Sequence, residues 1–251
     1  MHPFRNNVHE GNWDSANQFL SSHPEALSEK ISNDGDTALH IAILGGHMDI
    51  VKELVNKMSE ENLNTKNYYG CTVLGNCAQI GNIEIAKCII RKSRTLLSIG
   101  NYHKEVIPVV LAIKNNPNAI DTVHYLYNET PKEDLMPGKG VNGATFITQC
   151  IYAKAFDLAL DLLRRYPALA LALDVNNQTP LLALASVSFA YPSGNQAYIL
   201  ETMDLRQPLT LTLISFSNLT SSLYSQISSD FITVAVDFIA VTVDMDLDLE
   251  D

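Results

Sequence analysis

A nearly all-apolar stretch followed by an amphipathic one stands out between Gly35 and Val55, in "GDTALHIAILGGHMDIVKELV". The part at 38–44 predicts a short helix that is apolar on every side, which is stable only between packed neighbours. The part at 48–55 predicts an amphipathic helix. Its apolar face carries Ile50, Val51, Leu54 and Val55, and its polar face carries Asp49, Lys52 and Glu53. The pattern therefore predicts two helices joined by a tight turn.

The same pattern recurs along the chain, clearly at 70–90 and in weaker form at 143–163 and 177–185. Each copy carries a threonine near its start: Thr37, Thr72, Thr145 and Thr179. The double gap between the second and third threonines leaves room for a degenerate copy at 101–127, in which Val106 stands where threonine would. A period of about 33 to 35 residues indicates a stacked helical repeat.

Local signals mark where each copy begins and turns. Asp or Asn next to Gly predicts a turn, after which the threonine caps the first helix with its side-chain oxygen. We assign Gly143 to this turn in its copy, and Gly45 and Gly46 to the break between the two helices. One helix pair cannot bury both of its apolar faces, so the pairs must stack on one another.

The segment TALHIA (37–42) resembles the signature of the ankyrin repeat. The resemblance implies an all-α ankyrin repeat solenoid that extends from about residue 6 to residue 196. We expect an N-terminal capping unit at 1–32, since 6–31 retains only a second-helix pattern. The expected repeats are 33–66, 67–100, 101–138, 139–174 and a partial unit at 175–196.

Within that family, "EGNWDSANQFL…HPEAL…DGDTALHIA" and "LLALAS…FAYPSGNQ" are similar to plant ankyrin proteins of the PGG-domain type. Such proteins carry further repeats and then a membrane domain of several helices. This chain departs from that pattern after Gln196. Residues 197–251 form an irregular, non-repeat, acidic tail whose alternating pattern favours strands if it is ordered and which is otherwise disordered. A shortened product and a genuine variant tail both remain open.

The acidic tail also explains most of the net charge of -11. No Lys or Arg follows Arg206, whereas seven acids lie between Asp230 and Asp251. The rest of the chain has no basic face of the kind that binds nucleic acid. The apolar run at 231–243 is too short to span a membrane. Four cysteines without metal-ligand spacing favour reduced thiols and a cytoplasmic location, with any approach to the inner face of the plasma membrane through a partner.

Motifs for catalysis or cofactor binding give weak signals. GKGVNG (138–143) matches a dinucleotide-binding glycine pattern, but a polar connector precedes it where a strand is required. His40 is interpreted as a hydrogen-bonding link between neighbouring loops, and His47 is expected to face solvent. We therefore expect no enzyme activity, no cofactor, no metal and no small-molecule substrate.

The candidate binding residues lie at the tips of the turns, which in ankyrin arrays project as fingers beside a groove. Aromatic rings at such sites bury a large area on binding for little loss of side-chain entropy. The alternative is that the rings pack along the row of fingers and stabilise stacking. The resemblance implies a protein partner and an adaptor or scaffold in plant stress or defence signalling; the rival hypothesis is a truncated, non-functional fragment of a membrane-anchored protein. The candidate partner-binding residues are Asp34, Asp36, Tyr68, Tyr69, Tyr102 and His103.

Overall fold

A computed structural model describes residues 3–102, 105–136 and 141–186. Every regular element in these ranges is helical, which confirms the all-α prediction. The chain divides into two compact units, Met1–Asp134 and Leu135–Asp251. The predicted tail at 197–251 lies outside the described residues.

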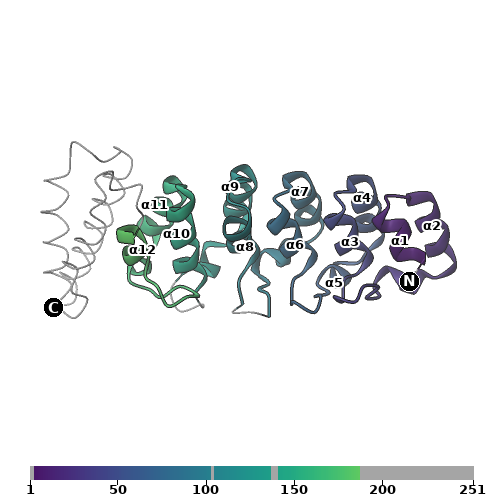
Figure 1. The fold of residues 1–251 in the computed structure, drawn as a ribbon, viewed down its shortest axis with the longest axis horizontal. Coiled ribbons are helices and arrows are strands. Elements are labelled where there is room, and N and C mark those ends of the chain that lie inside the picture. Colours follow the sequence, from purple (N-terminus) through teal and green to yellow (C-terminus); the bar gives the residue numbers. More distant parts are fainter. Residues whose placement is uncertain (1–2, 103–104, 137–140, 187–251) are drawn as a thin grey trace, which may run out of the picture. The chain divides into compact units, whose positions relative to one another are not determined.

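The first unit consists of four helical hairpins placed side by side (Figure 1). The first helices of the hairpins, α1, α3, α6 and α8, contact one another in that order, and among the second helices α4, α7 and α9 do the same. The hairpins are α1 (Pro3–His9) with α2 (Trp13–Ser22), α3 (Ala38–Leu44) with α4 (Met48–Lys57), α6 (Val73–Ile80) with α7 (Ile83–Lys92), and α8 (Pro108–Asn115) with α9 (Ile120–Glu129). A short helical turn follows each hairpin: η1 (Pro24–Leu27), α5 (Glu60–Leu63), η2 (Arg94–Ser98) and η3 (Lys132–Asp134).

The second unit contains one longer hairpin and the start of another. Helix α10 packs against both α11 and α12. The elements are α10 (Asn142–Ala153), α11 (Phe156–Arg165), η4 (Pro167–Ala170) and α12 (Pro180–Ser186).

Burial follows the hydrophobic pattern closely in the repeat at 33–66. All residues of α3 except Leu44 are buried, as predicted for a helix that is apolar on every side. Helix α4 buries its predicted apolar face and exposes Asp49, Lys52 and Glu53. Because each face meets a different neighbour, the hairpin is stable only within the stack.

The threonine caps form in three of the four predicted places. Thr72 accepts a hydrogen bond from the Gly75 amide at 3.3 Å, and Thr179 accepts one from the Leu182 amide at 3.2 Å. Thr37 and His40 form a capping box at the start of α3. The prediction is wrong for Thr145, which lies inside α10, where its hydroxyl donates to the Val141 carbonyl at 2.7 Å.

Two other local predictions also fail. The residue that precedes α8 in the threonine position is Ile107, not Val106, and it leads into Pro108 at the first helical position. Gly143 is not a turn residue but lies in the first turn of α10. A Cβ atom at Gly143 would collide with the Leu135 carbonyl oxygen, so this position needs glycine for close approach and not for a turn.

The sequence pattern places both Gly45 and Gly46 in the turn between α3 and α4, but only one of them has the left-handed conformation. Gly46 has the left-handed φ of +69°, whereas Gly45 keeps a right-handed conformation with φ of -77°. The hairpin break is therefore set by Gly46.

The N-terminal segment contains more structure than its pattern predicts. Residues 1–32 include α1 as well as the expected second helix α2, and Phe4 and Val8 of α1 are fully buried. The Phe4 ring stacks on Phe19 of α2 with centroids 5.3 Å apart.

Among the described residues, no helix has the length and apolar character needed to cross a membrane.

Candidate protein-binding surface

The turn segments before α3, α6 and α8 form the finger row, defined here as residues 30–36, 66–71 and 100–102. In the first two fingers, one polar side chain at the base holds the backbone. Ser32 Oγ accepts hydrogen bonds from the amides of Asp34 at 3.2 Å and Asp36 at 2.9 Å. Asn67 Oδ1 likewise accepts from Tyr69 at 3.1 Å and Cys71 at 3.0 Å. Short polar side chains satisfy turn amides well, and these bonds fix the finger conformation.

Adjacent fingers are joined to each other by the predicted residue Asp36. Its carboxylate accepts from the side-chain amide of Asn67 at 2.9 Å and from the Ser32 hydroxyl at 3.1 Å. The side chain is buried, with 6% of the residue exposed. Asp36 therefore connects two fingers and offers little surface to a partner. A backbone bond of 2.9 Å from the Tyr68 amide to the Asp34 carbonyl adds a second connection.

The ring of Tyr68 lies against Gly35 of the preceding finger. A Cβ atom at Gly35 would stand 2.7 Å from Tyr68 Cδ1, and Gly35 has a φ of +75°. Glycine is therefore required both for space and for the left-handed backbone conformation. The ammonium of Lys30 lies 4.7 Å from the ring centroid. The ring is thus held in place while 64% of Tyr68 stays exposed.

The same arrangement occurs one repeat later. Tyr102 lies against Gly70, which has a φ of +78°, and the ammonium of Lys66 is 5.0 Å from the Tyr102 ring centroid. Lys66 also donates to the Gly100 carbonyl at 2.6 Å. Tyr102 remains 64% exposed. The rings therefore pack along the row and still present large surfaces to solvent.

Tyr69 points its hydroxyl across the row to Asp34. Its O–H donates to Asp34 Oδ1 at 3.2 Å, and 58% of the residue is exposed. The bond to the Asp34 carboxylate raises the pKa of the Tyr69 phenol. Among the predicted binding residues, Asp34, Tyr68, Tyr69 and Tyr102 are brought together and exposed, whereas His103 lies outside the described residues.

His40 links two repeats, as the sequence predicted. Its Nδ1 accepts from the Thr37 hydroxyl at 2.8 Å, and its Nε2–H donates to the Cys71 carbonyl of the next repeat at 3.2 Å. The ring is fully buried, and this burial lowers the pKa of His40. A neutral imidazole that both accepts and donates is therefore a structural link, with no free nitrogen for base catalysis.

A second set of hydrogen bonds lies at the other end of the first helices, where each hairpin turns. These bonds join neighbouring hairpins, and the sequence pattern did not predict them. His47 Nε2 donates to the His9 carbonyl at the end of α1, at 2.9 Å, so this partly exposed ring, which was expected to face solvent, also links two hairpins. Asn116 Nδ2 donates to the Ile80 carbonyl at the end of α6, at 2.6 Å. Each link supplies a donor to a carbonyl that has no partner within its own helix.

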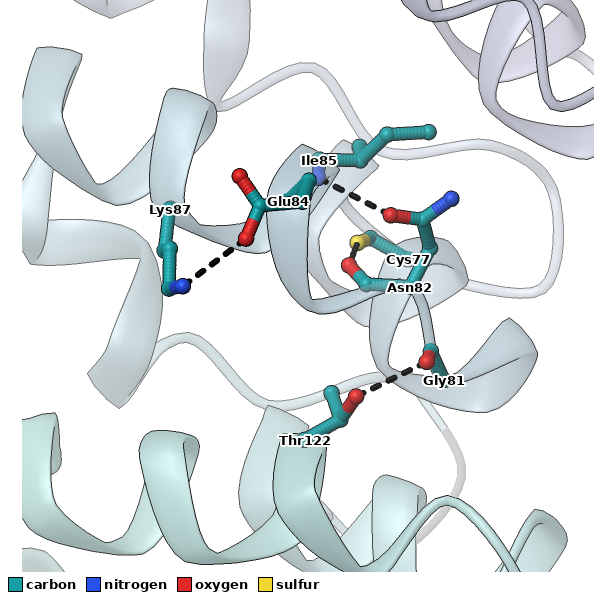
Figure 2. A network of polar contacts seen from close by, with 7 residues as sticks. All are labelled: Cys77, Gly81, Asn82, Glu84, Ile85, Lys87 and Thr122. Atoms are coloured by element: carbon teal, nitrogen blue, oxygen red, sulfur yellow. Dashed lines mark hydrogen bonds and ion pairs between the residues drawn. The ribbon is translucent and has the colours of Figure 1, made fainter.

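Further hydrogen bonds surround the break between α6 and α7 (Figure 2). Thr122 of α9 donates to the Gly81 carbonyl at 2.7 Å, while Asn82 Oδ1 caps α7 by accepting from the Ile85 amide at 3.1 Å. The Cys77 thiol donates to the Asn82 carbonyl at 3.2 Å. Burial raises the pKa of Cys77, so this thiol is a packed core group and not a reactive one. Within the described ranges, no group of His, Cys, Asp and Glu is placed to hold a metal ion.

Comparison with known families agrees with this geometry. A family model described as "Ankyrin repeats (3 copies)" matches residues 7–99. Residues 7–99 are thus similar to three ankyrin repeats. The matched range covers the α3/α4 and α6/α7 hairpins and begins inside α1, so it includes the segment in which the sequence pattern predicted only one helix. No curated protein matches the chain.

Proposed function

We propose that this chain is a protein-binding scaffold and that its partner contacts the exposed finger row. Ankyrin repeats mediate protein binding and are typically scaffolds without enzymatic activity. The observation that carries the proposal is the row of three exposed tyrosines on fingers whose backbones are held by side-chain hydrogen bonds. A preorganised aromatic surface loses little entropy on binding, which is why such residues dominate protein interfaces.

The finer expectations belong to the same proposal. A role as an adaptor in plant stress or defence signalling rests on the resemblance to PGG-domain proteins, as does contact with the plasma membrane through a partner. The rival hypothesis of a truncated, non-functional fragment predicts that no specific partner exists.

The test is affinity capture from a cell extract with the intact chain and with a Tyr68→Ala/Tyr69→Ala/Tyr102→Ala variant. Partners held by the intact chain and lost by the variant would support the proposal. Because two of these rings pack on glycines, circular dichroism must first show that the variant remains folded.

Two further variants separate binding from folding. Asn33→Trp adds bulk at an exposed finger tip without removing a packing contact, and it should also reduce capture. Tyr152→Ala is the matched control, since Tyr152 is 41% exposed and its hydroxyl is bonded to Gln178 at 2.8 Å, outside the finger row. Equal loss of partners with the Tyr152 variant would argue against the finger row as the binding surface.

A further inference from the structure

Two lysines of the finger row place their ammonium groups over tyrosine rings. Lys30 lies over Tyr68 and Lys66 lies over Tyr102, one repeat apart. An ammonium over an aromatic face keeps its charge and can still attract an anion. The two lysine–tyrosine pairs, Lys30 with Tyr68 and Lys66 with Tyr102, are called the rungs below.

The carboxylates closest to the rungs already have partners within the fold. Asp34 accepts from the Tyr69 hydroxyl, and Asp36 is buried and accepts from Ser32 and Asn67. Lys30, by contrast, forms no ion pair with any described residue, and Lys66 bonds only a neutral carbonyl there. The donors to Asp34 and Asp36 are neutral, and the finger row contains two lysines and two aspartates. The ammonium groups of Lys30 and Lys66 have no ion pair to a described residue and can each form one with an acidic partner.

The rungs also present hydrogen-bond donors. The hydroxyls of Tyr68 and Tyr102 make no hydrogen bond to described residues, and both side chains are mostly exposed. A phenol beside an ammonium suits a carboxylate, which accepts from both.

We infer that the partner segment bound by the finger row is extended and acidic, with carboxylates about three residues apart. This inference rests on the proposed function and adds the chemistry of the partner. Packed helices stand about 8–10 Å apart, so successive rungs repeat at about that distance. A polyproline II segment rises about 3.1 Å per residue with three residues per turn, so acids at every third position reach successive rungs on the same face.

The test uses a synthetic peptide of four Glu-Pro-Pro triplets, with a matched peptide of four Gln-Pro-Pro triplets. Fluorescence polarisation with the full chain should show saturable binding of the glutamate peptide and at least about tenfold weaker binding of the glutamine peptide. Raising the salt concentration should weaken only the former.

Single substitutions then locate the binding. Lys30→Gln should weaken the glutamate peptide by about threefold to tenfold, and Tyr68→Phe, which keeps the ring and removes only the hydroxyl, should weaken it by a smaller factor. Lys57→Gln on α4 removes an equally charged exposed side chain outside the finger row and should change nothing.

Three results would overturn the inference: no saturable binding of the glutamate peptide, equal affinity for the two peptides, or equal effects of the Lys30 and Lys57 substitutions. The proposed function has a separate outcome. A chain that captures a partner through its tyrosines but ignores the acidic peptide keeps the function and loses this assignment of its partner.

Discussion

At the scale of single residues, two buried polar groups differ in how well their hydrogen bonds are satisfied. His40 is neutral and bonded on both ring nitrogens, whereas one carboxylate oxygen of Asp174 has no hydrogen-bond partner among the described residues. These opposite situations lead to opposite expectations for substitution.

The stability of the first unit should fall as the pH drops below about 6.5, because His40 is buried in its neutral form. Its folded-state pKa is lowered below the unfolded value, so the unfolded chain binds a proton first and the contribution of His40 is lost on acidification. Urea titrations of the intact chain between pH 5.5 and 7.5 measure this slope. His40→Gln should be less stable by about 1–3 kcal/mol at pH 7.5 and should show a shallower slope. An unchanged slope in the variant would assign the titration to another group.

Asp174→Asn should stabilise the protein by about 1 kcal/mol. Asp174 holds its finger as Asn67 does, with Oδ1 accepting from the Asn176 amide at 2.7 Å and the Gln178 amide at 2.9 Å. Its Oδ2 is buried without a hydrogen bond to any described residue. An amide keeps the Oδ1 acceptor and places a neutral NH2 at the other position, and an unpaired neutral group costs less to bury than a charged one. Thermal melts of the two chains give the comparison.

The reciprocal change, Asn67→Asp, is the control. It replaces the donor to Asp36 by a second carboxylate oxygen and should cost about 2 kcal/mol. If both substitutions shift the melting temperature in the same direction, the comparison of the two finger bases is wrong.

At the scale of elements, the glycines of the fingers and of the hairpin breaks have different tasks. Gly35 needs both a left-handed φ and space for the Tyr68 ring, whereas Gly46 needs only the left-handed φ and has open space around it. Gly46→Ala should therefore cost about 1–2 kcal/mol from backbone strain alone. Gly35→Ala should cost clearly more, because the Tyr68 ring must also move. Chemical denaturation of both variants tests this, and equal losses would mean that the ring contact adds no stability.

The hydrophobic pattern was sufficient to predict the hairpins at 38–57 and 73–92 and three of the four threonine caps. It missed α1, whose sequence offers only two core residues and no capping signal, so that burial against α2 and α3 decides its structure. It misplaced the start of α10, because the close approach of Gly143 to Leu135 depends on tertiary packing. The lysines over Tyr68 and Tyr102 and the donors at the hairpin breaks could not be predicted for the same reason. Stacking brings together residues that are about one repeat apart in the sequence.

At the scale of the whole molecule, stacked hairpins contact mainly their neighbours, so damage should stay local. Trp13, the single tryptophan, lies at the start of α2 and reports on the first unit, while circular dichroism reports on all helices. Phe146→Ala in α10 should cost about 3–5 kcal/mol locally and shift the circular dichroism transition.

The Trp13 fluorescence transition should move much less with that variant than with Leu39→Ala in α3, which removes a fully buried side chain from the first unit. Urea denaturation followed by both signals makes the comparison. Coincident shifts of the two signals in both variants would show that the described helices unfold as one cooperative body.

The finger backbones are held from their bases, by Ser32 and Asn67, and not by the residues at their tips. Tip positions such as Asn33 and Tyr69 can therefore change while the loop around them keeps its shape. A gene library that varies only these codons would alter what the surface recognises at little cost in stability. The same separation gives natural variants of such a chain a route to new partners by single mutations.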